Sequence, residues 1–307
     1  MNDRAVLFAY NEMGVRGLEA LLAGGMEVAL VVTHEDDPSE NVWFGSVAEL
    51  ARRNRIPVIT PANPNEAETL ERIRRLRPHW LFSFYYRNLL GRELLELPEK
   101  AALNLHGSLL PHYRGRVPVN WAVLHGERRT GATLHRMVEK PDAGAIVDQQ
   151  AVPILPNDTA IEVFHKVVCA AEMVLERTLP RLLAGDWKET PQELEKGSYF
   201  GGRRPEDSRI DWSAGAWSIH NLVRAVAPPY PAAFFDLDGR RIHLTGSYYR
   251  GEAAAGPAPR LYWEEGACFA DCIDGERFEV TGLLLDGTPL DQTAFQERFG
   301  ESLTISI

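Results

Sequence analysis

The sequence predicts an α/β protein with a doubly wound, mostly parallel sheet and a second, smaller C-terminal β domain. Short apolar runs alternate with helical patterns over the first half of the chain, which is the rhythm of a parallel sheet covered by helices. From about residue 232 the pattern changes to short alternating runs broken by Gly and Asp, as in small all-β domains. A chain of 307 residues also favours two domains over one.

The strands of the predicted sheet are short apolar runs, as expected where both faces of a parallel sheet are buried. They are expected at residues 5–10, 28–33, 57–59, 80–84 and 101–106. The segment 11–14 is predicted as a turn, and helices are expected at 15–23, 46–53 and 67–76.

The remaining elements complete the predicted order. An alternating strand is expected at 130–137, a long helix at 159–183, a loop at 197–205 and a helix at 216–226. The C-terminal β domain is barrel-like or sandwich-like and contains a loop rich in Ala, Gly and Pro at 253–259.

Composition excludes several classes of protein. The net charge of −10 argues against nucleic acid as the main partner, because phosphate binding needs a basic surface. Three cysteines are too few for a disulfide framework, and the pair Cys268 and Cys272 lacks a second Cys/His pair for zinc. With no signal-peptide pattern and no membrane-length apolar run, we expect a soluble, cytoplasmic protein. The first turn lacks G-x-G-x-x-G, which disfavours a nicotinamide cofactor.

Chemically active residue types gather from the carboxyl end of the strand at 101–106 onward, at the sheet edge where such folds bind ligands. Asn104 and His106 are two residues apart, so their side chains share one face of an extended segment. Together an amide and an imidazole can stabilise an oxyanion and move a proton. Asp142 is a candidate third member that would orient His106 and favour its imidazolium form. Taken singly, each residue could equally end a strand or form a turn.

The run N-L-H-G-S-L-L-P-H-Y-R-G at 104–115, followed by D-A-G at 142–144, resembles the folate-dependent formyltransferase family. The resemblance covers most of the chain and weakens in the C-terminal β region. It implies a Rossmann-like catalytic domain over 1–200, then a linker and a small OB-like domain over 201–307. It also implies an enzyme that transfers a formyl group from 10-formyltetrahydrofolate to an amine without a metal, with Asn104, His106 and Asp142 as catalytic residues.

Other segments resemble the branch of the family that acts on UDP-4-amino-4-deoxy-L-arabinose: F-A-Y, F-Y-Y-R, R-V-P-V-N-W and F-G-G-R-R at 8–10, 84–87, 116–121 and 200–204. That branch implies a role in lipid A modification and antibiotic resistance. The alternative acceptors are another nucleotide-linked amino sugar and methionyl-tRNA. An alternative of a different class is a catalytically inactive protein that binds folate or a nucleotide sugar. The segment F-G-G-R-R contains one glycine more than the corresponding motif of that branch. The best-known arabinose enzyme carries a C-terminal decarboxylase, and the 307 residues of this sequence do not include one. A separate decarboxylase is therefore a possible partner. Whether the chain is naturally separate or a shortened form stays open.

The resemblance also implies two binding regions. Residues implied to hold the folate are Asn88, Leu89, Leu90, Arg116, Val138, Glu139, Lys140 and Pro141. The nucleotide sugar is expected at Tyr10, Arg203 and Arg204, because adjacent guanidinium groups suit a diphosphate. Without the family, the same segments read as a helix start, a hairpin exit, a packed aromatic ring and solvated arginines.

Overall fold

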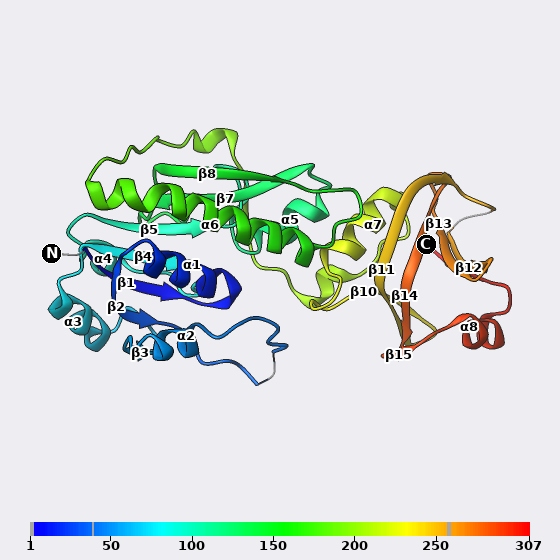
Figure 1. The fold of residues 1–307 in the computed structure, drawn as a ribbon. Coiled ribbons are helices and arrows are strands. Elements are labelled where there is room, and N and C mark those ends of the chain that lie inside the picture. The colour runs from blue at the N-terminus through cyan, green and yellow to red at the C-terminus, as the bar shows by residue number, and fades with distance from the viewer. Residues whose placement is uncertain (1–2, 39, 257–258) are drawn as a thin grey trace. The chain divides into compact units, whose positions relative to one another are not determined.

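The computed structural model describes residues 3–38, 40–256 and 259–307 (Figure 1). Residues 257 and 258 of the predicted loop at 253–259 lie outside them. The chain forms two compact units that interleave along the sequence. The N-terminal unit consists of Met1–Pro118, Thr130–Val152 and His165–Gly201, and the C-terminal unit of Val119–Arg129, Pro153–Phe164 and Gly202–Ile307. Two segments that precede residue 200 group with the C-terminal unit.

The N-terminal unit is built on a seven-stranded sheet, in the order β3-β2-β1-β4-β5-β7-β8. Neighbours from β3 to β5 are parallel, whereas β7 is antiparallel to β5. This confirms the predicted α/β class. The strands are β1 (Arg4–Ala9), β2 (Glu27–Val32), β3 (Val58–Ile59), β4 (Trp80–Phe84), β5 (Ala101–His106), β7 (Arg129–Arg136) and β8 (Ile146–Pro153). Strand β8 was not predicted because it is polar, and none of its residues is fully buried.

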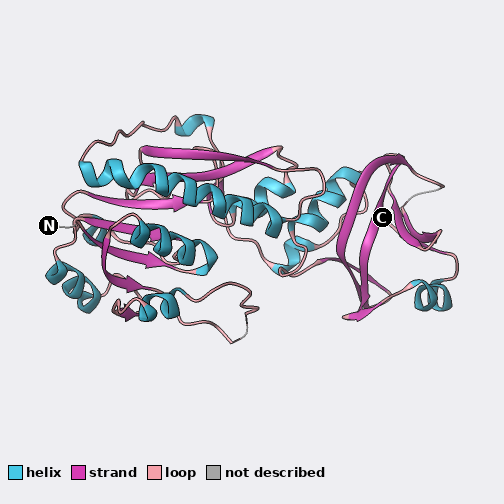
Figure 2. Ribbon diagram, in the orientation of Figure 1, coloured by secondary structure: helices cyan, strands magenta, loops and turns pink. Residues whose placement is uncertain are grey.

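Helices cover both faces of this sheet (Figures 1 and 2). On one face, Val6 and Phe8 of β1 cluster with Leu70 and Ile73 of α3 and Leu94 of α4. Helices α1 and α6 lie over the other face. The helices of this unit are α1 (Asn11–Ala23), α2 (Val47–Arg53), α3 (Ala67–Leu76), α4 (Arg92–Leu95) and most of α6 (Ala160–Ala184), whereas α5 (Pro118–Leu124) falls almost wholly in the C-terminal unit.

Helix α1 begins at Asn11, so the predicted turn at 11–14 is wrong. Asn11 adopts a φ of 66°, a left-handed conformation that asparagine tolerates better than most residues. Its side-chain oxygen accepts a hydrogen bond from the N–H of Glu12 at 2.6 Å. These two features let the helix start directly after Tyr10, without a separate turn.

The C-terminal unit contains a curled antiparallel sheet in the order β10-β11-β14-β13-β12-β16, with β15 paired to β14 (Figure 2). This confirms the predicted small β domain. Ile219 and Val223 of α7 pack with Ile242, Leu244 and Phe278 in its core. Its elements are α7 (Ala216–Ala225), β10 (Ala233–Leu237), β11 (Arg240–Ala253), β12 (Arg260–Glu264), β13 (Ala267–Asp271), β14 (Glu276–Leu285), β15 (Thr288–Pro289), α8 (Gln292–Phe299) and β16 (Ser302–Thr304).

Helix α8 was not predicted from the sequence. Its N-terminus is capped by Asp291, whose side chain accepts a hydrogen bond from the N–H of Ala294. Phe295 is its buried residue, so the helix carries no clear apolar stripe. Among the described helices of the whole chain, none is both long and apolar enough to cross a membrane.

Candidate active site

Asn104 and His106 lie at the carboxyl end of β5, as the two-residue spacing predicts. Because β7 runs antiparallel to β5, Asn104 is paired with His135 and His106 with Thr133. His106 is 6% exposed and His135 is 1% exposed. The sheet therefore brings an amide and two nearly buried imidazoles together at one edge.

Asp142 reaches this edge from the loop after β7, with its backbone in the left-handed region at a φ of 52°. Its Oδ2 accepts a hydrogen bond from the N–H of Gly115 at 2.8 Å. Gly115 has a φ of +97°, and a Cβ there would lie 2.1 Å from the carbonyl oxygen of Phe200. Only glycine fits this position, where β6 (Arg114–Gly115) pairs with β9 (Tyr199–Phe200). The pairing of these two short strands fixes the amide that holds Asp142.

The other oxygen of Asp142 is where the site converges. Oδ1 lies 3.5 Å from Asn104 Nδ2, 3.6 Å from His106 Nδ1 and 3.5 Å from His135 Nε2. These distances are at or beyond the limit of a good hydrogen bond. The structure thus brings Asn104, His106 and Asp142 together, while their facing polar atoms keep capacity for a substrate atom.

Both ring nitrogens of His106 lie beside oxygen atoms. Its Nε2 donates a hydrogen bond to the carbonyl oxygen of Tyr113 at 2.8 Å, and its Nδ1 faces the carboxylate of Asp142. Burial by itself raises the pKa of Asp142, but the charge of His106 and the hydrogen bond from the N–H of Gly115 act against it, and that pKa lies well below its usual range. Asp142 is therefore an ionised partner for His106.

His135 is the residue of this site to which the sequence pattern assigns no role. Its Nδ1 donates to the carbonyl oxygen of Arg136 at 2.9 Å, so Nε2 is free to accept from Asn104 Nδ2 at 3.0 Å. This bond fixes the amide of Asn104 and turns its second N–H toward Asp142. His135 thus acts as a positioning residue for Asn104. In the sequence, the sign of such a residue is a polar side chain within the apolar strand that pairs with Asn104.

We expect His135→Leu to lower kcat on the order of 10- to 100-fold, because the Asn104 amide loses the bond that orients it. The KM for the formyl donor should change little, since His135 acts through Asn104. Steady-state kinetics on both variants would check this, with His135→Gln as a conservative variant expected to recover part of the rate. Equal kcat values for His135→Leu and the wild type would show that Asn104 is oriented without His135.

The residues expected to hold the folate lie in two loops of the N-terminal unit and, for Arg116, directly after β6. Asn88 donates from Nδ2 to the carbonyl oxygen of Ala62 at 3.3 Å, in the loop that follows β4. Leu89 is 70% exposed, and Leu90 is half-buried against the core under α3 and α4. Arg116 is exposed and donates its backbone N–H to Phe200 at 2.9 Å. The second loop leads into Asp142 and consists of Val138, Glu139, Lys140 and Pro141.

The residues expected to hold the nucleotide sugar come from both units. Tyr10 is 4% exposed, and its hydroxyl donates to Asp36 Oδ1 at 2.7 Å, which matches the packing alternative. Burial, followed by the bond to Asp36, raises the pKa of Tyr10 to about 12. Arg203 and Arg204 belong to the C-terminal unit.

The two arginines differ in environment. The guanidinium of Arg203 lies 5.0 Å from the ring centre of Trp121 and donates to the carbonyl oxygen of Asp207 at 2.6 Å. Arg204 is exposed and donates its backbone N–H to the carboxylate of Asp207. Within the described residues, no group of three or more His, Cys, Asp or Glu side chains is placed to hold a metal ion.

Solved structures with the same fold include several formyltransferases. The N-formyltransferase from Helicobacter canadensis, in complex with folinic acid and dTDP-3-aminofucose, has 22% sequence identity and a TM-score of 0.73, and covers 91% of this chain and 99% of its own. WlaRD, a sugar 3N-formyl transferase solved with dTDP and 5-N-formyl-THF, has 22% identity and a TM-score of 0.73, with 91% and 97% covered. HypX from Aquifex aeolicus has 18% identity and a TM-score of 0.65, and this chain spans 49% of its length.

Two family models match the sequence itself. The model described as formyl transferase matches residues 5–179, and the model of the formyl transferase C-terminal domain matches residues 203–286. The first match contains Asn104, His106, His135 and Asp142. Because that match alone covers more than half of the sequence, the chain belongs to the formyl transferase family and is an enzyme of formyl-group transfer.

Proposed function

We propose that the enzyme transfers the formyl group of 10-formyltetrahydrofolate to the 4-amino group of a UDP-linked amino sugar, UDP-4-amino-4-deoxy-L-arabinose. The observation that carries the chemistry is the convergence of Asn104, His106 and His135 on one oxygen of Asp142. Two structural neighbours support a folate and a nucleotide-linked substrate, because they were solved with folinic acid or 5-N-formyl-THF together with dTDP or a dTDP-amino sugar.

In this proposal Asn104 and His106 act on the formyl carbon as the acceptor amine attacks it. The N–H of Asn104 and the Nδ1–H of His106 donate to the oxyanion that forms, in place of their long contacts with Asp142. Asp142 keeps the imidazolium charged by its position 3.6 Å from Nδ1. As the bond to N10 of the folate breaks, His106 gives its Nδ1 proton to N10, and it is then reprotonated by the proton that the newly formylated amine loses.

We assign the folate to the loops 88–90 and 138–141, with Arg116 as a further contact. Leu89 and Val138 are large apolar side chains that are 70% and 42% exposed. Exposed apolar side chains in loops beside a polar site suit the flat ring of a pterin. The backbone of Val138, Glu139, Lys140 and Pro141 leads directly into Asp142, which links this loop to the catalytic residues.

The choice of acceptor rests on the segments that resemble the arabinose-specific branch. Arg203 and Arg204 are proposed to meet the diphosphate, and Tyr10 to contact the sugar. In this reading the enzyme works in the cytoplasm in lipid A modification and antibiotic resistance, alongside a separate decarboxylase. Another nucleotide-linked amino sugar is the second candidate, because the neighbours were solved with dTDP compounds. The net charge of −10 disfavours methionyl-tRNA.

A competition between acceptors tests this assignment. The enzyme is given 10-formyltetrahydrofolate with UDP-4-amino-4-deoxy-L-arabinose, a dTDP-3-amino sugar, a dTDP-4-amino sugar and initiator methionyl-tRNA, and products are read by mass spectrometry. We expect formylation of the UDP sugar alone. A formylated dTDP sugar or tRNA, with the UDP sugar unchanged, would replace the proposed acceptor and keep the chemistry.

A further inference from the structure

A cavity of about 640 Å³ lies within the C-terminal unit, and none of its lining residues belongs to the candidate active site. Its walls come from the turn after α5, the segment that follows β8, helix α7 and strand β11. The lining residues are Gly126, Glu127, Arg128, Pro153, Ile154, Leu155, Pro156, Trp217, Arg224, Tyr249 and Arg250.

Two aromatic rings form one wall of this cavity. The rings of Trp217 and Tyr249 are 5.1 Å apart between centroids, and both side chains are partly exposed. His220 stacks behind Tyr249 at 5.7 Å and is fixed by hydrogen bonds to Ser247 and to the carbonyl oxygen of Pro156. His220 thus supports the wall from behind, and the partly exposed rings of Trp217 and Tyr249 offer aromatic surface to a flat ring.

The cavity is also positively charged, in a chain whose net charge is −10. Arg128, Arg224 and Arg250 line it against one carboxylate, that of Glu127. Arg250 is already paired with Glu279 at 2.8 Å. The side chain of Arg128 is exposed, and no hydrogen bond or ion pair of its guanidinium is found among the described residues.

Arg224 supplies a buried positive charge to the same cavity. It is 1% exposed, and its guanidinium lies 5.4 Å from the ring centre of Trp217. It donates to neutral oxygens, the side chain of Asn221 at 2.8 Å and the carbonyl of Asp158 at 2.9 Å. Burial lowers the pKa of Arg224 to about 10, against an opposing effect of Asp158, because the charge is poorly solvated. An anion in the cavity would compensate this charge.

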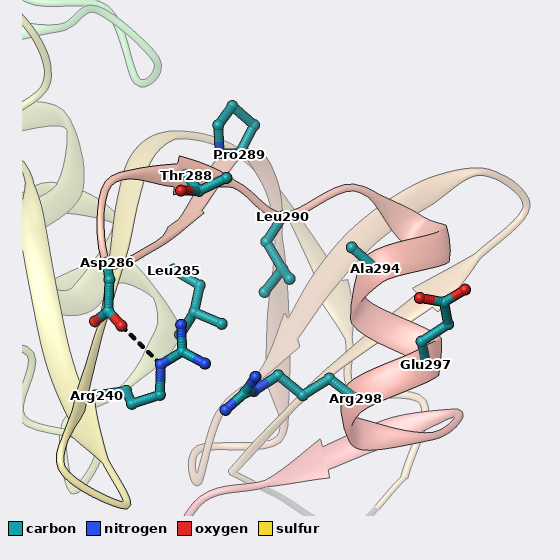
Figure 3. Close-up of a pocket in the computed structure, with 9 residues that line it drawn as sticks. All are labelled: Arg240, Leu285, Asp286, Thr288, Pro289, Leu290, Ala294, Glu297 and Arg298. Carbon is teal, nitrogen blue, oxygen red and sulfur yellow. Dashed lines mark hydrogen bonds and ion pairs between the residues drawn. The ribbon is translucent and has the colours of Figure 1, made fainter.

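A second hollow in this unit lacks both features (Figure 3). It has a volume of about 550 Å³, and Arg240 and Arg298 extend into it from opposite sides around Leu285 and Leu290. Arg240 donates to Asp286 at 2.7 Å. Its two arginines are balanced by Asp286 and Glu297, and no aromatic side chain lines it. The aromatic wall and the excess of cations thus distinguish the cavity beside Trp217 from this hollow.

We propose that the cavity beside Trp217 binds a nucleoside phosphate, with the base against Trp217 and Tyr249 and the phosphate between Arg128 and Arg224. Stacking on an aromatic side chain accepts any base, and guanidinium groups suit phosphate oxygens. The ligand is either a free nucleotide or the nucleotide part of a nucleotide sugar, since both carry this chemistry. The inference does not depend on the proposed acceptor.

Isothermal titration of the full chain with UMP tests this site. We expect Arg128→Ala and Trp217→Ala each to weaken one binding event on the order of 10-fold or more, through loss of a phosphate contact or of a stacked ring. Arg298→Ala, in the charge-balanced hollow, is the matched control and should bind like the wild type. Because Arg128 is exposed, its variant should fold even if Trp217→Ala does not, and thermal unfolding of each variant checks this.

Two comparisons separate the outcomes. UMP affinity unchanged in both Arg128→Ala and Trp217→Ala would overturn the site. Binding that weakens only in Arg203→Ala and Arg204→Ala would also overturn it, because it would locate the nucleotide at the proposed substrate contacts. If both variants weaken binding, the affinities for UMP and for a UDP-sugar are compared. Equal affinities show that the ligand is a free nucleotide, and tighter binding of the UDP-sugar shows that it is a nucleotide sugar. Neither comparison measures formyl transfer. A wrong choice of acceptor would therefore show only in the competition between acceptors and would leave this result unchanged.

Discussion

Asp142→Asn is expected to lower kcat by about 10³- to 10⁴-fold, the scale seen when an aspartate that orients a catalytic histidine becomes an amide. The amide keeps the shape of the side chain but carries no charge. His106 Nδ1, 3.6 Å away, then loses the carboxylate that favours its imidazolium, and an N–H of the new amide competes for the same place. Steady-state formyl transfer with saturating donor and acceptor measures the effect.

The fold of Asp142→Asn should survive, because the amide oxygen can still accept the hydrogen bond from the N–H of Gly115. Circular dichroism and the binding of a non-reactive folate serve as controls on this point. A turnover within about threefold of the wild type, a barrier change under about 1 kcal/mol, would remove Asp142 from the mechanism.

His106→Ala is the second change with a large expected effect, about 10²- to 10⁴-fold in kcat. It removes both the donor to the oxyanion and the group that carries the proton from the amine to the folate. The KM for the donor should change far less than kcat, because His106 is 6% exposed and its interactions strengthen in the transition state. Pre-steady-state and steady-state rates with the same acceptor would measure this split.

His165→Ala is a matched control for His106→Ala. His165 is an exposed histidine on α6 of the same unit, whose ring contacts Trp43 at 6.4 Å between centroids. Its loss should leave kcat close to that of the wild type. If both variants were equally active, the chemistry would not pass through His106.

Much of the fold and part of the site are visible in the sequence, since they depend on local patterns. Apolar runs locate β1 to β5, and the period of a strand places Asn104 and His106 on one face. The approach of Asp142 is not visible, because it depends on the N–H of Gly115, 27 residues earlier, and on the pairing of β6 with β9. His135 stays hidden until β7 is known to run antiparallel to β5 and to pair with Asn104.

The division into units also depends on contacts far apart in sequence. Asn120 donates to the carbonyl oxygen of Ala225, and Asn157 exchanges hydrogen bonds with the backbone of Tyr249. These bonds attach the segments 119–129 and 153–164 to the C-terminal unit. In the sequence, both segments lie between stretches that belong to the N-terminal unit. No local pattern of residues encodes such a partner.

The most direct test follows the formyl carbon itself. 10-Formyltetrahydrofolate labelled with ¹³C in the formyl group is incubated with UDP-4-amino-4-deoxy-L-arabinose and the wild type, His106→Ala or Asp142→Asn, and the sugar is examined by mass spectrometry. We expect labelled N-formyl sugar from the wild type and almost none from either variant. Labelled formate without labelled sugar, or equal labelling of the sugar by all three proteins, would contradict formyl transfer by Asn104, His106 and Asp142.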